Sequence, residues 1–404
     1  MSSTNLPPAN LPKKHLFELP EGIIYLDGNS LGPLPKAVSS AVADCVEAQW
    51  GGQLIKGWND CGWMEQPVRV GTQIASLIGA PSGSVVMGDT LSIKVFQALA
   101  AALDMRPDRN VIVSDSGNFP TDLYMAEGLM RLKGRDYRLE TPEPDAVLDA
   151  INADVAAVML TQVDYRTGRM HDMRATTQMA QEAGCVMIWD LAHSAGAIEV
   201  DLAGSNCEFA VGCTYKYLNG GPGAPAFIYV RPDLVKSVEP ALAGWLGHAE
   251  PFAFDPSYRP ALDIERMRVG TPPVLQMTAL EAALSVWKDV YMSEVRSASL
   301  RLGDLFIAEV ERRCDGLELV SPRDGGQRGS QVSFAFDHGY AAMQALIARG
   351  VIGDFRAPNI MRFGFTPLYV DDEDVLAAVD IFEDVIANRL WDHPDYQQRG
   401  NRVT

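Results

Sequence analysis

The chain has 404 residues, of which 47% are hydrophobic and 21% are charged, a composition typical of a folded globular protein. This length exceeds one typical domain core, so we expect a large domain and a smaller one. The formal net charge of -18 argues against a general affinity for nucleic acid or anionic membranes, and any anionic ligand must meet a local positive site.

The N-terminal stretch, up to residue 52, opens with the Pro-rich run MSSTNLPPANLPKK, which lacks the apolar core of a signal peptide. No stretch of the sequence approaches the ~20 apolar residues of a membrane span, so we expect a cytoplasmic protein. The N-terminal stretch is too short to fold alone, and we expect it to pack against the C-terminal part of the chain.

In the middle of the chain, short β-branched runs alternate with longer amphipathic stretches. This pattern predicts an α/β domain with a mainly parallel sheet. The predicted strands are residues 85–87, 110–114, 156–160, 186–189, 209–212 and 226–230. The predicted helices include residues 68–78, 121–132 and 173–183.

Near Val295 the pattern changes to a long helix (298–313), two short strands (317–320 and 331–336) and two further helices (340–348 and 373–388). This order is typical of a separate α+β unit. We therefore predict a large domain over residues 53–294 and a discontinuous small domain formed by residues 1–52 and 295–404.

The cysteines contain no CxxC pair and lie mostly in apolar runs, where free thiols commonly pack. They are Cys45, Cys61, Cys185, Cys207, Cys213 and Cys314. We expect no disulfide framework.

The most informative segment is GCTYKYLNGGPG, residues 212–223, in which Lys216 follows a predicted strand and precedes a glycine-rich loop. A lysine in this position can be partly desolvated, which lowers the pKa of its amine and favours attack on an aldehyde to form a Schiff base. A solvated loop lysine is the ordinary alternative.

Upstream, the run IWDLAH (188–193) is a buried-looking strand that ends in Asp190 and is followed by His193. Parallel α/β sheets bind ligands at this end of a strand, and a carboxylate there can pair with the pyridinium nitrogen of a pyridoxal ring. The alternatives are a helix-capping aspartate and a structural histidine.

The run VVMGDTLSIK (85–94) predicts a strand, a turn and a helix with Ser92 in its first turn. Backbone N–H groups at a helix N-terminus, together with a hydroxyl, bind phosphate without net positive charge. Simple helix capping by Thr and Ser is the alternative.

These three segments, with NFPTD (118–122) between them, resemble fold type I pyridoxal phosphate enzymes of the class V aminotransferase type, and in detail the kynureninase family. The resemblance covers nearly the whole chain. Its motifs are YLDGNSLG (25–32), NFPTDLY (118–124), WDLAHSAG (189–196), TYKYLNGGPG (214–223) and MRFGFTPLY (361–369).

The resemblance implies that pyridoxal 5′-phosphate is bound covalently by Lys216, with Asp190 on its ring nitrogen. The other residues it places around the cofactor in the same chain are Leu91, Ser92, Phe119, Asp122, Thr161, His193 and Tyr215. Trp245 and Thr271 match positions that reach the cofactor's phosphate from the partner subunit, which implies a homodimer with shared active sites. No metal site is expected.

Arg362 matches the arginine that pairs with the substrate carboxylate in the family. A guanidinium can grip a carboxylate with two parallel bonds, but a structural ion pair is the alternative for an arginine in an apolar run. Asn29, Ser30 and Trp58 match positions near the aromatic substrate. Family members that favour 3-hydroxykynurenine tend to carry Asn at the position of Thr271, so we expect kynurenine itself to be preferred.

The implied activity is hydrolysis of L-kynurenine to anthranilate and L-alanine, in tryptophan degradation or NAD biosynthesis. Lys216 would remove the α proton, and Tyr215 would handle a proton at the γ-carbonyl. One alternative is another class V enzyme, an aminotransferase or a cysteine desulfurase, although Cys61 and Cys314 lack the glycine-flanked loop of a desulfurase cysteine. The other is a non-catalytic cofactor-binding regulator, although the acidic chain offers no basic DNA-binding helix.

Overall fold

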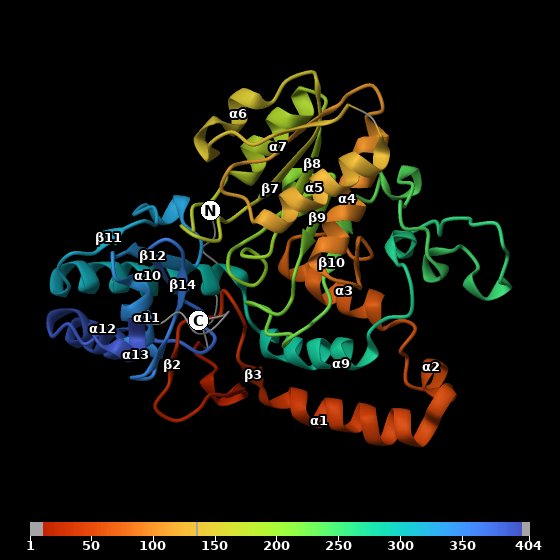
Figure 1. The fold of residues 1–404 in the computed structure, drawn as a ribbon. Helices are drawn as coiled ribbons and strands as arrows, with labels where there is room; N and C mark the ends of the chain where they lie inside the picture. Colours follow the sequence, from red (N-terminus) through yellow and green to blue (C-terminus); the bar gives the residue numbers. More distant parts are fainter. Residues whose placement is uncertain (1–10, 135, 398–404) are drawn as a thin grey trace, which may run out of the picture.

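The computed structural model describes residues 11–134 and 136–397. Its centre is a seven-stranded sheet (Figure 1). In spatial order the strands are β4 (Val85–Met87), β10 (Phe227–Val230), β9 (Phe209–Gly212), β8 (Val186–Asp190), β7 (Val155–Thr161), β5 (Val111–Val113) and β6 (Arg138–Glu140). β10 runs antiparallel to β4 and β9, and the other neighbouring strands run parallel. The predicted α/β fold with a mainly parallel sheet is confirmed.

Helices cover both faces of this sheet. α3 (Gln66–Leu77) and α7 (Met173–Glu182) share one hydrophobic core with it, and α4 (Leu91–Met105) and α5 (Pro120–Lys133) share the other. All the strands except β6 are therefore buried throughout, and such strands have nearly continuous apolar sequences. β6 was not predicted, because its Arg-Leu-Glu sequence lies at a partly exposed edge and carries no apolar run.

The C-terminal unit contains a four-stranded antiparallel sheet with helices packed on it. Its strands lie in the order β11 (Glu318–Leu319), β12 (Gln331–Ala335), β15 (Ile360–Gly364) and β14 (Asp354–Arg356). Its helices are α10 (Met292–Arg313), α11 (Gly339–Ile347) and α12 (Asp372–Ala387). α10 begins six residues before the predicted start at 298, directly after the extended residue Tyr291.

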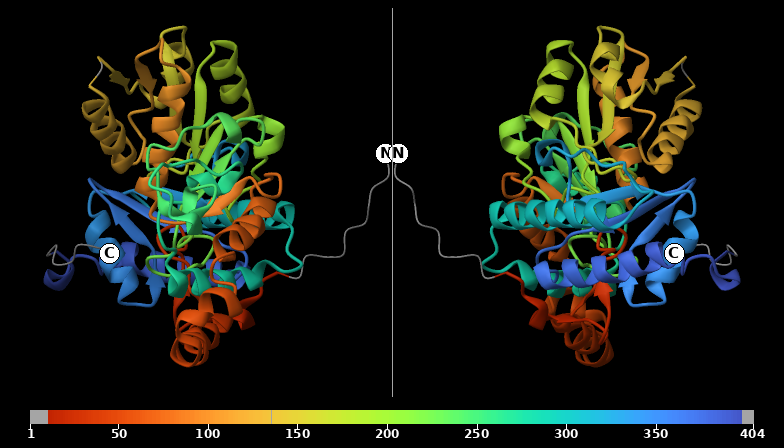
Figure 2. Two further views of the ribbon diagram at one scale, coloured as in Figure 1. Left: turned by 90° about the vertical axis from the view of Figure 1, so that its right-hand side faces the viewer. Right: turned by 90° about the vertical axis from the view of Figure 1, so that its left-hand side faces the viewer.

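The N-terminal segment contacts both parts of the molecule (Figure 2). β2 (Ile24–Tyr25) pairs in parallel with β13 (Val351–Ile352) of the C-terminal unit. By contrast, α1 (Lys36–Asp44) packs along α9 (Val274–Ala283) of the middle part. The domain limits predicted from the sequence, 53–294 against 1–52 with 295–404, stay a proposal.

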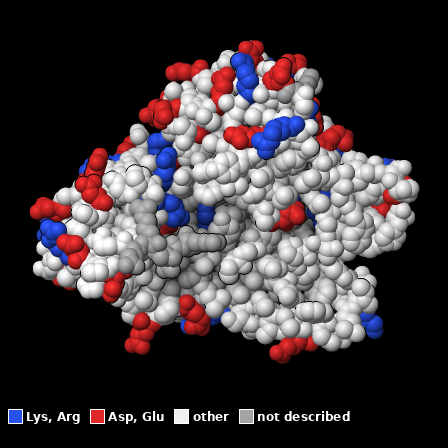
Figure 3. All heavy atoms as spheres, viewed as in Figure 1, with Lys and Arg blue, Asp and Glu red and all other residues white. Residues whose placement is uncertain are grey.

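In the described part of the chain, no helix combines the length and the apolar composition needed to cross a bilayer. All six cysteines are free thiols, and only Cys61 is not buried. On the face shown in Figure 3, acidic side chains are scattered along the outline, while some Lys and Arg atoms lie in the hollow near its centre.

Candidate active site

Lys216 lies in the loop after β9, and its Nζ is 2.9 Å from Nε2 of His193. The histidine follows β8, the next strand of the sheet, so the parallel strands bring the two side chains together at their carboxyl ends. His193 is buried. Burial, together with the charge of Lys216, holds the pKa of His193 well below its usual value. The imidazole is therefore neutral, and its Nε2 can accept a hydrogen bond from the lysine.

Two buried carboxyl groups face each other beside this lysine. Asp190 ends β8 and accepts the N–H of Ala192 at 2.8 Å, and Asp122 of α5 shares a hydrogen bond with it. Burial and the charge of Asp190 raise the pKa of Asp122 well above its usual value. Burial also raises the pKa of Asp190, but Lys216 opposes this effect. Asp122 is therefore the protonated member of the pair and Asp190 the ionised one.

This pair fits the expected cofactor. An ionised, buried Asp190 suits a protonated ring nitrogen, which would add a positive charge where the carboxylate has lost its water. Oδ2 of Asp122 is buried and has no hydrogen-bond partner among the described residues, so a polar edge of a ligand can still be bound there.

Asn118 joins two neighbouring parts of the site. Its Oδ1 accepts hydrogen bonds from Thr161 Oγ1 at 2.5 Å and from the backbone N–H of Phe119 at 2.7 Å. Thr161 ends β7 and lies beside Asp190 in the sheet register. Phe119 is 44% exposed and meets Tyr165 edge to face, with 5.2 Å between ring centroids. The phenyl face is therefore free to stack on a planar ring. Asn118 lies in the motif NFPTD (118–122), but no role was predicted for it from the sequence.

The turn before α4 presents backbone donors. Gly88 and Asp89 have positive φ angles of 151° and 58°, and α4 begins at Leu91 with Ser92 in its first turn. Thr90 precedes the helix, yet its side chain makes no capping hydrogen bond. The capping alternative is thus not realised by Thr90, and the first N–H groups of α4 remain available to an anion.

Arg362, on β15, is engaged in a buried ion pair. Its Nε donates to Asp354 Oδ1 at 2.6 Å, and its Nη2 donates to Asp354 Oδ2 and to Ser30 Oγ. Its Nη1 donates to the carbonyl of Tyr165. Four of its five N–H groups are therefore in use. The structural ion pair that the sequence left as an alternative is present.

The other members of this charged group, Asp354 and Arg356, were not predicted from the sequence. Asp354 lies opposite Arg362 in the β14–β15 register. Arg356, 34% exposed, approaches the same Asp354 Oδ2 at 2.7 Å. The only local signal was the alternation of Asp354 and Arg356, which places both side chains on one face of a strand.

Three predicted residues, Trp58, Thr271 and Trp245, make contacts in other parts of the fold. Trp58 packs edge to face on Trp63, and both line a cavity of about 450 Å³ together with Thr271. Trp58 is therefore grouped with Thr271 rather than with Arg362. Trp245 is 42% exposed and donates from Nε1 to the carbonyl of Pro251 at 2.7 Å.

Of the remaining predicted residues, Asn29 is buried, and neither polar atom of its side chain has a partner among the described residues. Tyr215 is half-buried, and the charge of Cys213 together with burial raises the pKa of its phenol. Its carbonyl accepts the N–H of Gly32, which ties the lysine loop to the N-terminal segment.

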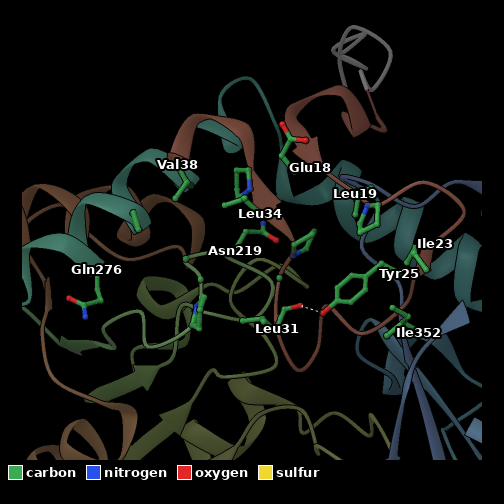
Figure 4. Close-up of a pocket in the computed structure, with 18 residues that line it drawn as sticks. Glu18, Leu19, Ile23, Tyr25, Leu31, Leu34, Val38, Asn219, Gln276 and Ile352 are labelled. Carbon is green, nitrogen blue, oxygen red and sulfur yellow. Dashed lines mark hydrogen bonds between the residues drawn. The ribbon is translucent and has the colours of Figure 1, made fainter. Parts of the chain in front are cut away.

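An apolar cavity of about 400 Å³ lies beyond that contact (Figure 4). The N-terminal segment, residues 219–222 and α9 line it, and Tyr25 Oη donates to the carbonyl of Leu31 at 2.7 Å across one wall. The predicted site residues are not among those that line it.

The chain is similar to known proteins over almost all of its length. Residues 295–382 match the family model of the kynureninase C-terminal domain. Kynureninase of Burkholderia pseudomallei (strain 1106a) is 49% identical over 395 residues, 96% of this chain and 95% of that protein. Kynureninase of Pseudomonas fluorescens is 48% identical with the same coverage.

Among solved structures, the apo cysteine desulfurase of Thermococcus onnurineus NA1 aligns with a TM-score of 0.79 and 18% identity, over 93% of this chain and 98% of that one. A C-DES mutant with glycine covalently linked to its PLP cofactor aligns with a TM-score of 0.80 and 16% identity, over 92% and 99%. These likenesses confirm the fold, and the full-length relatives show that the chain belongs to the kynureninase family.

Proposed function

We propose that the chain hydrolyses the Cβ–Cγ bond of L-kynurenine, giving anthranilate and L-alanine, with pyridoxal phosphate as cofactor. This reaction serves tryptophan degradation or NAD biosynthesis. Family membership supports the activity. The observation that supports it within the site is the contact of Lys216 with neutral His193, beside the buried Asp190–Asp122 pair.

The residues suit the cofactor's separate parts. Lys216 would be the covalent anchor, Asp190 would pair with the ring nitrogen, and Phe119 would cover the ring face. The first turn of α4, with Leu91 and Ser92, would hold the phosphate together with Tyr215. Thr161, Asp122 and His193 would complete the surroundings of the ring. When bound, pyridoxal phosphate supplies an electron sink for a carbanion at the substrate's α-carbon.

The protein's own groups move the protons. Once its amine is free, Lys216 takes the proton from the substrate's α-carbon as general base. His193 stays neutral, so it accepts a hydrogen bond from the lysine and holds the amine in place. Tyr215 is the candidate for handling a proton at the γ-carbonyl. Its raised pKa keeps the phenol protonated, so the hydroxyl can donate a hydrogen bond to the carbonyl oxygen when water adds there.

We propose that Arg362 also binds the substrate carboxylate. A two-point grip requires it to release Ser30 Oγ or the Tyr165 carbonyl, while the bonds to Asp354 fix the plane of the guanidinium. Ser30 and Asn29 lie on the same side of the site, near the substrate.

We further propose a homodimer in which Trp245, Thr271 and Trp58 of one chain complete the site of the other. Large apolar side chains are exposed on the segments that carry them, as expected for a surface covered by a second copy. They are Trp50, Leu54, Ile55, Phe252, Phe254 and Leu262. We propose a cytoplasmic location without binding to membranes or nucleic acid, in keeping with the acidic balance.

Incubation of the purified, cofactor-loaded protein with L-kynurenine tests the activity directly, by the appearance of anthranilate fluorescence. Mass analysis of the products distinguishes anthranilate from the keto acid that an aminotransferase would form. Release of sulfide from cysteine would indicate a desulfurase instead. Burial raises the pKa of Cys314 to about 11, which disfavours it as a nucleophile.

A further inference from the structure

A lysine near the start of α4 is buried although the proposed chemistry does not use it. Lys94 has a fully buried side chain. Its Nζ donates to Asp89 Oδ2 at 3.3 Å, to Gln97 Oε1 at 2.9 Å and to the carbonyl of Met267 at 3.1 Å. Gln97 Nε2 donates to the same carbonyl at 3.2 Å.

These contacts select the charged lysine. An ammonium has three N–H donors, and here each has an acceptor. Burial lowers the pKa of Lys94, and the Asp89 carboxylate opposes this effect only in part. A buried charge destabilises a fold unless it is paired, and an apolar side chain could fill the same space more favourably. The lysine is therefore better explained by a role of its charge than by packing.

The ammonium lies beneath the turn from which α4 starts. Asp89 has a positive φ of 58°, and a Cβ built on Gly88 would be 3.8 Å from Lys94 Nζ. On the other side, Met267 ends the short helical turn Ile264–Met267, which leads to Arg268 and then to Thr271. Lys94 thus joins the turn before α4 to the segment that carries Thr271.

We infer that Lys94 is a positioning residue for the cofactor's phosphate. Its ammonium fixes the turn before α4 and adds positive charge behind the N–H groups of the first helical turn. A chain of net charge -18 gives a phosphate dianion no general attraction, so a local positive charge adds to the binding that the N–H groups of α4 provide. The inference rests on the placement of the phosphate at α4 proposed above.

Binding of two ligands to the apo protein tests the inference without any catalytic readout. Lys94→Met should weaken the affinity for pyridoxal phosphate by about tenfold or more. It should change the affinity for pyridoxal, which lacks the phosphate, by about twofold at most. Equal losses for both ligands would show a merely structural residue and overturn the inference. Gln97→Met removes one of the three acceptors of Lys94 and a bond to the same carbonyl, but no charge, and should affect neither ligand strongly.

Asp89→Asn changes the local charge in the opposite direction to Lys94→Met. It therefore tests the role of the lysine's charge even if Lys94→Met does not fold. Asparagine tolerates a positive φ, and the change removes a negative charge while Lys94 stays charged. Affinity for pyridoxal phosphate should be kept or increased. Weaker binding of pyridoxal phosphate than of pyridoxal in this variant would contradict a role of the lysine's charge.

Ser92→Ala separates this inference from the phosphate placement on which it rests. If Ser92→Ala weakens pyridoxal phosphate binding more than pyridoxal binding while Lys94→Met does not, the placement stands and the role of Lys94 is wrong. If neither variant distinguishes the two ligands, the placement itself is wrong, and the inference falls with it.

Discussion

The neutral state of His193 allows its imidazole to accept a hydrogen bond from Lys216. If the imidazole were protonated it would repel the lysine, but burial and that same charge keep it neutral. The ionised Asp190 also interacts electrostatically with the lysine, so the amine has both an acceptor and an anion near it. The contact with His193 holds the amine of Lys216 in place.

Lys216→Ala should abolish steady turnover and remove the visible absorbance of covalently bound cofactor. The reason is that a methyl side chain offers no amine to the aldehyde or to the substrate's α proton. Absorbance spectra and product assays check both effects. Borohydride reduction of the wild-type protein followed by peptide mapping should label Lys216, and a label on Lys94 or another lysine would contradict the assignment.

The two carboxyl groups should respond differently to the same change. Asp190→Asn removes the anion from the ring nitrogen and should lower kcat by about 100-fold or more, because the unprotonated ring is a poor electron sink. Asp122→Asn imitates the protonated carboxyl group already present and should keep most of the activity. Steady-state kinetics on cofactor-saturated variants measure both effects. Equal losses of kcat would refute the assignment of the charge to Asp190 and of the proton to Asp122.

Lys216, Asp190 and His193 could be predicted because each lies in a short motif next to a recognisable strand. The sharing of one proton by Asp122 and Asp190 could not, because it depends on burial and on contact between residues 68 positions apart in the chain. Asn118 was missed for the same reason, since its partner Thr161 comes from another strand.

At the scale of elements, the pairing of β14 with β15 determines that Arg362 forms an ion pair with Asp354. The register sets Asp354 opposite the arginine, and both side chains are buried. No sequence pattern specified this pairing, so the choice between a substrate clamp and an ion pair could not be made. The structure shows the ion pair and leaves the guanidinium one N–H group that is not engaged.

Arg362→Lys separates the two roles better than truncation does. A lysine keeps a positive charge for Asp354, so the melting temperature should fall only slightly. It cannot bond both oxygens of a carboxylate in one plane, so kcat/KM for kynurenine should fall by the equivalent of about 2 kcal/mol or more. A kynurenine analogue without the α-carboxylate serves as control and should lose much less. Unchanged kcat/KM for kynurenine would leave Arg362 a structural role.

Asp27 of the N-terminal segment interacts with Asp354 of β14 and adds a group whose ionisation makes stability depend on pH. Burial, followed by the charge of Asp354, raises the pKa of Asp27 to about 7. Between its usual value and about 7 the folded protein binds a proton that the unfolded chain has released, so this group lowers stability as the pH rises. Asp27→Asn should make the free energy of unfolding less dependent on pH between 5 and 8, by on the order of 1 kcal/mol. Denaturant titrations at several pH values measure this, and an unchanged slope would contradict the raised pKa.

At the scale of the whole molecule, the α/β class and the mainly parallel sheet could be predicted because buried strands have distinctive apolar runs, whereas the order of the strands in the sheet was not predicted. The position of the N-terminal segment could be predicted only in part. β2 joins the C-terminal unit as expected, but α1 lies along α9, since its contacts depend on the final packing and not on local pattern. The grouping of Trp58 with Thr271 was likewise invisible, because these residues meet only in the folded chain.

Mixing two inactive variants tests the shared sites proposed for the homodimer. Lys216→Ala damages the site of its own chain, whereas Trp245→Ala should damage the site of the partner. In a heterodimer of the two, the chain with intact Lys216 receives the intact Trp245, so one complete site forms. Random exchange of subunits should therefore restore about a quarter of the wild-type activity per site.

A mixture of Lys216→Ala with Asp190→Asn is the matched control. Both of these changes damage the site of the chain that carries them, so every site in that mixture is defective and no activity should return. Heterodimer formation can be verified with two affinity tags. If tagged heterodimers form, Trp245→Ala alone is inactive and no activity appears on mixing, then Trp245 acts within its own chain and the sites are not shared.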